Sequence, residues 1–135
     1  MDFCSKALSI INDGVNFITA NHMRLTEVRE GFCAGELTVV PESLNPMGKV
    51  HGGCLAALAD TVCASVVRSY GRRGVTLDST VHYLAAARGS RIRCEGRIVR
   101  MGRSVAVCSA TLLDERGVTV AVGTYTFHLL DQPTV

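Results

Sequence analysis

Residues 51–67, which read HGGCLAALADTVCASVV, decide how this chain folds. The run after the two glycines is apolar on almost every face, and a helix of that kind is normally buried on all sides. Asp60 lies in its middle, where a carboxylate is costly to desolvate unless another group pairs with it or uses it. Gly52 and Gly53 open the helix, and the first N–H groups of a helix have no partner inside it. They can therefore approach an anion or a polarised carbonyl oxygen. The stretch predicts a central helix over about residues 52–70 and indicates acyl chemistry.

The rest of the chain predicts one further helix and six strands around this central helix. Apolar residues recur at helical spacing over residues 3–20. Runs rich in β-branched residues, separated by turn signals, predict strands at 24–30, 33–40, 75–85, 91–100, 104–113 and 118–130. A curved antiparallel sheet of about six strands can wrap one apolar helix, so we expect an α+β fold in a single domain of residues 1–135. Such a sheet leaves an edge, which a second copy of the chain commonly covers, and we therefore expect a dimer.

Composition and charge exclude several classes of protein. Hydrophobic residues make up 47% of the chain and charged residues 19%, as in ordinary globular proteins. No apolar run reaches the ~18 residues of a membrane span, and no secretory signal is visible, so we expect a cytoplasmic protein that does not bind membranes. A net charge of +2 is too small to indicate a nucleic-acid partner. The histidines and cysteines are scattered, which predicts free thiols and no metal site.

Basic residues are concentrated between Arg68 and Arg103, where nine of the fourteen lie. Arg91, Arg93 and Arg97 alternate with less polar residues at the period of a strand, which favours a solvated strand face. A patch for a phosphorylated ligand is the alternative interpretation.

Four groups of residues, in this order, resemble the hotdog-fold acyl-CoA thioesterases of the phenylacetic-acid-degradation and THEM2-like group. They are Asn45 with His51-Gly52-Gly53 and Asp60, then Thr76-Leu77-Asp78, Tyr83-Leu84, and Arg100-Met101-Gly102-Arg103-Ser104. The resemblance covers about residues 30–130 and implies a long helix wrapped by an antiparallel sheet. It also implies homodimers, usually paired into tetramers, that hydrolyse acyl-CoA. No metal or cofactor is implied, since CoA is part of the substrate.

The resemblance also implies roles for individual residues. Asp60 matches the catalytic carboxylate, and Gly52 matches the glycine whose amide polarises the thioester carbonyl. Asn45 matches a side-chain amide that helps to hold the substrate or the attacking water. His51 matches the motif histidine, whose role is more often orienting than acid–base, and Thr76 falls where a hydroxyl assists the water. The residues expected to bind CoA are Gly53, Gly102, Arg103 and Ser104.

Spacing adds a constraint on how these residues can cooperate. Asp60 would act as general base on water or as a nucleophile, and the sequence does not decide between the two. Gly52 and Asp60 lie eight residues apart on one helix, which is roughly 12 Å along its axis. One thioester carbonyl cannot contact both. If both act at one site, they come from different chains whose central helices run antiparallel across a two-fold axis.

Other interpretations remain open at this point. A hotdog-fold enoyl-CoA hydratase or dehydratase is one alternative, although such enzymes use a catalytic histidine and none follows Asp60 closely. A non-catalytic acyl-CoA-binding protein is another, although sensors of this fold carry a DNA-binding segment for which we expect no room. Individual residues also have plain structural interpretations. These are Asp60 as a satisfied buried polar group, Gly52-Gly53 as small residues that permit close helix packing, His51 as a plain N-terminal helix residue, Thr76 as an ordinary strand residue and Arg103 as a solvent-facing turn residue.

Overall fold

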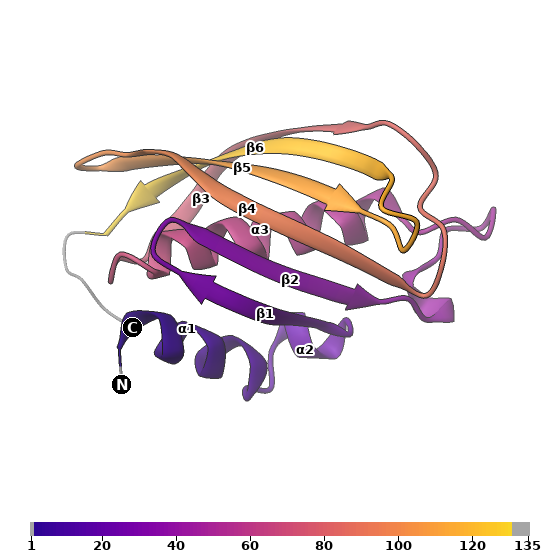
Figure 1. Cartoon of the computed structure of the whole chain (residues 1–135), viewed down its shortest axis with the longest axis horizontal. Helices are drawn as coiled ribbons and strands as arrows, with labels where there is room; N and C mark the ends of the chain where they lie inside the picture. The colour runs from indigo at the N-terminus through magenta and orange to yellow at the C-terminus, as the bar shows by residue number, and fades with distance from the viewer. Residues whose placement is uncertain (1, 131–135) are drawn as a thin grey trace.

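The computed structural model describes residues 2–130, and its centre is the helix α3, Gly52–Arg68. His51 caps the start of α3, because its side chain accepts a hydrogen bond from the Gly53 N–H. Ser69 caps its end, one residue before the predicted limit. Figure 1 shows α3 lying within the curve of the sheet, as the sequence predicted.

Six strands form one antiparallel sheet in the order β1-β2-β4-β5-β6-β3. Their bounds lie within two residues of the predicted ones: β1 Met23–Arg29, β2 Phe32–Thr38, β3 Gly74–Tyr83, β4 Arg91–Met101, β5 Val105–Leu113 and β6 Thr119–Leu129. The turn between β1 and β2 uses Gly31 at φ 82°, a left-handed conformation that glycine adopts without strain. A short 3-10 helix, Pro41–Ser43, opens the loop that leads to α3.

The core lies between the inner face of the sheet and α3. Leu58, Val62 and Val66 of α3 are fully buried against inward-facing residues of the strands. Gly35 of β2 and Gly96 of β4 bring the backbone of the sheet close to the helix, since a Cβ on either would come within about 3 Å of the Val62 side chain. The fold thus places the middle of α3 rigidly against the sheet.

The N-terminal region differs from the single helix predicted over residues 3–20. The structure has α1, Phe3–Asn12, and a separate short helix α2, Phe17–Ala20. The break arises because the Asn16 side chain caps α2 by accepting hydrogen bonds from the N–H groups of Ile18 and Thr19. The apolar spacing continues across the break, so periodicity alone could not reveal it. Helix α1 packs on β1 (Figure 1) and covers that end of the sheet.

One face of α3 is only partly covered, which corrects the expectation of a helix buried on all sides. Ala57, Thr61, Ala64 and Arg68 recur on this face, with Asp60 at its edge. The neighbouring strand β3 ends the sheet, and within residues 2–130 no strand pairs with its outer edge. Nearly all of β3 is exposed on both faces. A single chain therefore leaves apolar surface uncovered beside α3.

The strand arginines lie on a solvated face of the sheet, and the cysteines are free thiols, as the sequence predicted. Arg91, Arg93 and Arg97 are exposed, and all three pair with Glu36 or Glu95 on the outer face of the sheet. All six cysteines are free, and burial raises the pKa of the Cys33 thiol to about 12. None of the helices described is long and apolar enough to cross a bilayer.

Candidate active site

Asp60 and Thr76 meet at the uncovered face of α3. The Thr76 hydroxyl, on the inner side of β3, donates a hydrogen bond of 2.7 Å to Oδ1 of Asp60. Asp60 is partly exposed, so it is not the desolvated carboxylate that the apolar sequence around it suggested. The apolar neighbours point into the core, whereas Asp60 points toward β3. The structure therefore brings together two of the residues predicted for catalysis.

Two hollows run along this face of α3, and Asp60 lines both of them. The hollow toward the start of the helix measures about 270 Å³ and is lined by Ala56, Ala57, Asp60, Thr76, Ser79 and Tyr125. The hollow toward the end of the helix measures about 370 Å³ and also has Asp60 in its lining. The carboxylate thus lies at the junction of two spaces, which is where the reacting bond of an extended substrate could lie.

The start of α3 offers one free N–H group rather than the two that the sequence suggested. The Gly53 N–H donates to Nδ1 of His51 at 2.7 Å, so it is already satisfied. The Gly52 N–H has no hydrogen-bond acceptor within residues 2–130. His51 therefore fixes the first turn of the helix, in keeping with the predicted orienting role, and leaves the Gly52 amide available.

Two tyrosines to which the sequence analysis assigned no role hold the backbone of α3 beside the site. The Tyr83 hydroxyl donates to the Gly52 carbonyl at 3.1 Å, and a Cβ at position 52 would lie 3.3 Å from the Tyr83 ring. The Tyr125 hydroxyl donates to the Ala56 carbonyl at 2.8 Å. Burial raises the pKa of Tyr125, and the negative charge of Asp60 adds to the effect. Two signals for Tyr83 were present in the sequence: its place among the residues that carry the resemblance, and Gly52, whose small size admits a ring. No signal pointed to Tyr125.

Asn45 shapes the loop that precedes α3. Its Oδ1 accepts hydrogen bonds from the N–H groups of Met47 and Lys49, at 3.0 and 3.1 Å. The side-chain nitrogen has no hydrogen-bond partner in the described part of the chain, so it can donate to another group. The His51 N–H donates to the Ser43 carbonyl at 2.8 Å and ties this loop to the helix.

Three of the four residues predicted to bind CoA, Gly102, Arg103 and Ser104, form the turn between β4 and β5, whereas Gly53 lies in the first turn of α3. The Gly102 N–H closes this turn on the Val105 carbonyl at 2.9 Å, and the Ser104 carbonyl accepts from the N–H of Leu129. The side chain of Arg103 is exposed. Arg72, four residues beyond the end of α3, reaches the Arg103 carbonyl at 3.5 Å. The turn therefore lies at the end of α3, whereas Asn45 and Gly52 lie at its start.

One chain does not bring all of these residues together. Gly52 and Asp60 belong to the same continuous helix, and its rise separates them by roughly 12 Å along the axis. Among residues 2–130, no group of three or more His, Cys, Asp or Glu side chains is placed to hold a metal ion.

A family model of the thioesterase superfamily matches residues 47–121, which is more than half of the chain. The chain belongs to the thioesterase superfamily. It is thereby placed among the thioester hydrolases. The matched residues include the start of α3, Asp60 and Thr76.

Several individual proteins agree with this assignment. Acyl-coenzyme A thioesterase 13 of Homo sapiens is 31% identical over 98 residues, which cover 70% of this chain and 70% of that protein. The structure of a Streptococcus pneumoniae thioesterase with coenzyme A is 32% identical and has a TM-score of 0.79, over 83% of this chain and 88% of that one. The structure of Escherichia coli PaaI, from the phenylacetic-acid-degradation operon, has a TM-score of 0.91 over 98% and 97% of the two chains. At 21% identity, that last match shows the fold alone.

These matches confirm the hotdog fold and the resemblance to the phenylacetic-acid-degradation and THEM2-like thioesterases.

A protein of Archaeoglobus fulgidus is 31% identical over 84 residues, and that match spans 62% of this chain but only 54% of the length of the archaeal protein. Two further structures of the Streptococcus pneumoniae thioesterase carry single changes to alanine, at an aspartate and at a threonine sixteen residues apart. Asp60 and Thr76 have the same spacing of sixteen residues.

Proposed function

We propose that this chain hydrolyses acyl-CoA thioesters to a free acid and CoA, with Asp60 as the catalytic carboxylate. The observation that carries the proposal is the Asp60–Thr76 hydrogen bond at the junction of two hollows. A carboxylate that is held in one orientation and open to a cavity can reach a substrate. The relatives named acyl-coenzyme A thioesterases, and the neighbouring structure that contains coenzyme A, support CoA as the thiol part of the substrate.

In this proposal, side chains activate and position the reactants for attack on the thioester carbonyl, and a backbone N–H stabilises the oxyanion. Water attacks the thioester carbonyl carbon while Asp60 takes its proton, the C–S bond breaks, and CoA leaves as a thiolate that is then protonated. Alternatively, Asp60 attacks the carbonyl carbon, the C–S bond breaks with CoA leaving as a thiolate, and water then hydrolyses the resulting mixed anhydride to the free acid and the Asp60 carboxylate. In either case the Gly52 N–H stabilises the oxyanion, since a fixed backbone donor needs no reorganisation. Thr76 orients the carboxylate, and Asn45 positions the substrate or the water.

The proposed site is composite, with Asp60 from one chain and the Gly52 amide and Asn45 from its partner. The separation of roughly 12 Å along α3 requires this if one carbonyl contacts both groups. The exposed inner residues of β3, and its outer edge, which no strand of the described chain pairs with, support a partner at this face. We propose a homodimer with two equivalent sites, and a pair of such dimers as the complete assembly.

The alternatives are less well supported by the same geometry. A hydratase of this fold would need a catalytic histidine at the reacting carbon. No histidine lines either hollow in the described chain, and His51, which adjoins Gly52 in the composite site, already uses its Nδ1 to cap α3. A binding protein would need no oriented carboxylate, whereas Asp60 is both oriented and accessible.

Release of free CoA thiol from a panel of acyl-CoAs separates these functions. The panel covers short, medium and long aliphatic groups and an aryl-acetyl group. We expect release with at least one substrate, and loss of release in the Asp60→Asn variant. An Asp13→Asn variant is the matched control, because Asp13 is exposed in the link between α1 and α2. Tight binding of acyl-CoA without thiol release, or addition of water to an enoyl-CoA double bond, would contradict the proposed function.

A further inference from the structure

The hollow at the end of α3 has a distinct chemical character. Its floor is the helix face that runs from Asp60 to Arg68, and its walls come from the N-terminal helices, the start of β3 and the end of β6. The lining residues beyond Asp60 are Ile11, Ile18, Thr61, Ala64, Ser65, Arg68, Arg73, Gly74, Val75 and Leu130. The hollow thus has aliphatic walls, with a carboxylate at one end of its floor and two arginines at the other.

Arg68 is a half-buried guanidinium without a hydrogen bond or ion pair among residues 2–130. Burial lowers its pKa, and repulsion from the nearby charge of Arg73 lowers it further. Arg73 is exposed and likewise has no anionic partner in the described chain. Partial desolvation of an unpaired charge is unfavourable, so an anion between these two side chains would relieve both the burial cost and their repulsion.

The floor between Asp60 and Arg68 has few free polar groups. The Thr61 hydroxyl donates to the Ala57 carbonyl at 2.9 Å, and the Ser65 hydroxyl donates to the Thr61 carbonyl at 2.8 Å. Both hydroxyl protons are therefore committed to the helix backbone. The helix floor therefore offers few partners to the amides of the CoA arm, whereas a hydrocarbon chain fits the aliphatic walls.

We propose that this hollow takes the acyl group, and that Arg68 with Arg73 binds an anion at the far end of that group. The substrates would then be acyl-CoAs whose acyl chain ends in a carboxylate, because a guanidinium binds a carboxylate through paired charge-assisted hydrogen bonds. The proposal rests on the proposed function, since Asp60 marks the position of the thioester. Eight residues separate Asp60 from Arg68, roughly 12 Å along the helix, and this distance would select the length of the chain.

The test compares acyl groups of equal length that differ only at the far end: hexanoyl-CoA with adipoyl-CoA, and octanoyl-CoA with suberoyl-CoA. The wild-type protein should favour one of the two carboxylated substrates in kcat/KM. Arg68→Met keeps the apolar stem and removes the charge, so it should lower kcat/KM about tenfold or more for the carboxylated substrate and little for its methyl-ended match. Arg68→Lys should retain part of the preference. If Arg68→Met folds poorly, Arg73→Met at an exposed position tests the same claim, namely that these arginines bind the carboxylate at the far end of the acyl chain.

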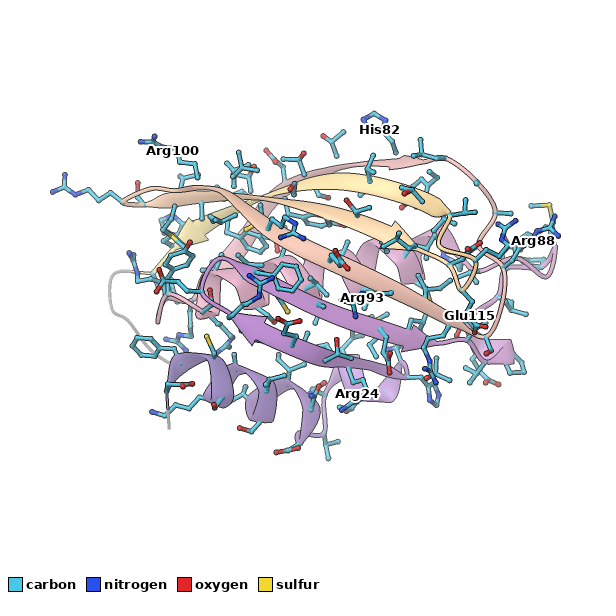
Figure 2. The ribbon with its side chains drawn as sticks, in the orientation of Figure 1. Arg24, His82, Arg88, Arg93, Arg100 and Glu115 are labelled. Carbon is cyan, nitrogen blue, oxygen red and sulfur yellow. The ribbon has the colours of Figure 1, made fainter. Side chains whose placement is uncertain are left out.

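Two control variants separate this site from binding of CoA itself. Arg100 lies on β4 just before the β4–β5 turn, and Arg88 lies at the opposite end of the molecule from it (Figure 2). Arg88 is therefore far from the turn predicted to bind CoA, and Arg88→Met should leave kcat/KM unchanged for both substrates. Arg103→Met should raise KM for both substrates alike if that turn holds a CoA phosphate. If Arg68→Met and Arg73→Met behave like Arg103→Met, the two arginines bind CoA, and the proposal is overturned. It is also overturned if they change neither substrate.

A binding measurement keeps the test independent of catalysis. Calorimetry with S-(5-carboxypentyl)-CoA and S-hexyl-CoA, which cannot be hydrolysed, should show tighter binding of the carboxylated thioether, and Arg68→Met should abolish the difference. Such a preference without hydrolysis of any acyl-CoA would support the anion site and contradict the proposed function. Hydrolysis of acyl-CoAs without any preference for the carboxylated compounds would support the proposed function and contradict the anion site.

Discussion

Asp60 owes its orientation to a single hydrogen bond from Thr76 across the gap between α3 and β3. A hydrogen bond to a charged group contributes about 1.5–3 kcal/mol, which is enough to decide which way a partly exposed carboxylate points. The same hydroxyl would be within reach of a water molecule activated by Asp60. Thr76 is therefore a positioning residue in this account.

Thr76→Val removes the hydroxyl and keeps the shape of the side chain. We expect kcat to fall about tenfold or more while KM changes little, because the carboxylate loses its orientation but the substrate contacts remain. Thr76→Ser should restore most of the activity, since a serine hydroxyl can make the same bond. Equal kcat values for the valine variant and the wild-type protein would show that Thr76 is an ordinary strand residue.

At the scale of elements, the turn between β5 and β6 is organised by Asp114. Its carboxylate accepts hydrogen bonds from the Arg116 side chain, at 2.6 and 3.0 Å, and from the N–H groups of Arg88, Arg116 and Val118. These contacts lower the pKa of Asp114 to about 2. The hydrogen bond from the Arg116 guanidinium is the main cause, and the backbone donors add to the effect. The charged carboxylate thus ties the 84–90 loop to the β5–β6 turn.

This lowered pKa predicts how stability depends on pH. An aspartate of an unfolded chain has a pKa of about 4, so the contribution of Asp114 is fully present above about pH 4 and is lost as the pH falls toward about 2. We expect Asp114→Asn to lower the melting temperature at pH 7. The difference between the two proteins should shrink between pH 4 and pH 2. A constant difference across that range, measured by thermal unfolding, would show that the charge of Asp114 is not what stabilises the turn.

The elements were predictable where one local rule governs them, and less so where several compete. The strands and α3 follow from periodicity and turn residues, and their bounds are confirmed to within about two residues. The break before α2 depends on side-chain capping by Asn16, which the apolar spacing hides. The exposure of β3 depends on its place at the end of the sheet, and no local pattern encodes strand order. Tyr83 and Tyr125 reach α3 only through that order.

The site residues divide in a similar way. Asp60 was visible because a charge in an apolar run is unusual, and the structure adds its contact with Thr76. The use of the Gly53 N–H by His51 was not foreseen, because a histidine is a less common helix cap than serine or aspartate. Arg68 lies eight residues beyond Asp60 on the same helix, so spacing could have linked the two residues.

For the whole molecule, we propose that a partner chain binds at the uncovered face of α3 and at the edge of β3, which has no partner strand within residues 2–130. A dimer through this face would place the start of one α3 beside the middle of the other. Each site would then take Asp60 from one chain and Asn45 from its partner. This arrangement can be tested without a structure of the assembly.

Co-expression of an Asp60→Ala chain with an Asn45→Ala chain should restore thioesterase activity that neither variant has alone. In a mixed dimer, one of the two sites receives both intact residues and the other receives both defects. Two different affinity tags allow the mixed dimer to be purified and verified. A verified mixed dimer without recovered activity would indicate that each site is built within one chain, as would a fully active monomer.

The catalytic role of Asp60 is decided by the steady-state hydrolysis of the best acyl-CoA substrate by wild-type, Asp60→Asn and Asp13→Asn proteins. We expect Asp60→Asn to lower kcat by ~10²-fold or more with an unchanged melting temperature, because the site loses its base or nucleophile. Asp13→Asn should match the wild-type protein. Turnover by a folded Asp60→Asn protein at close to the wild-type rate would contradict the claim that this carboxylate performs the hydrolysis.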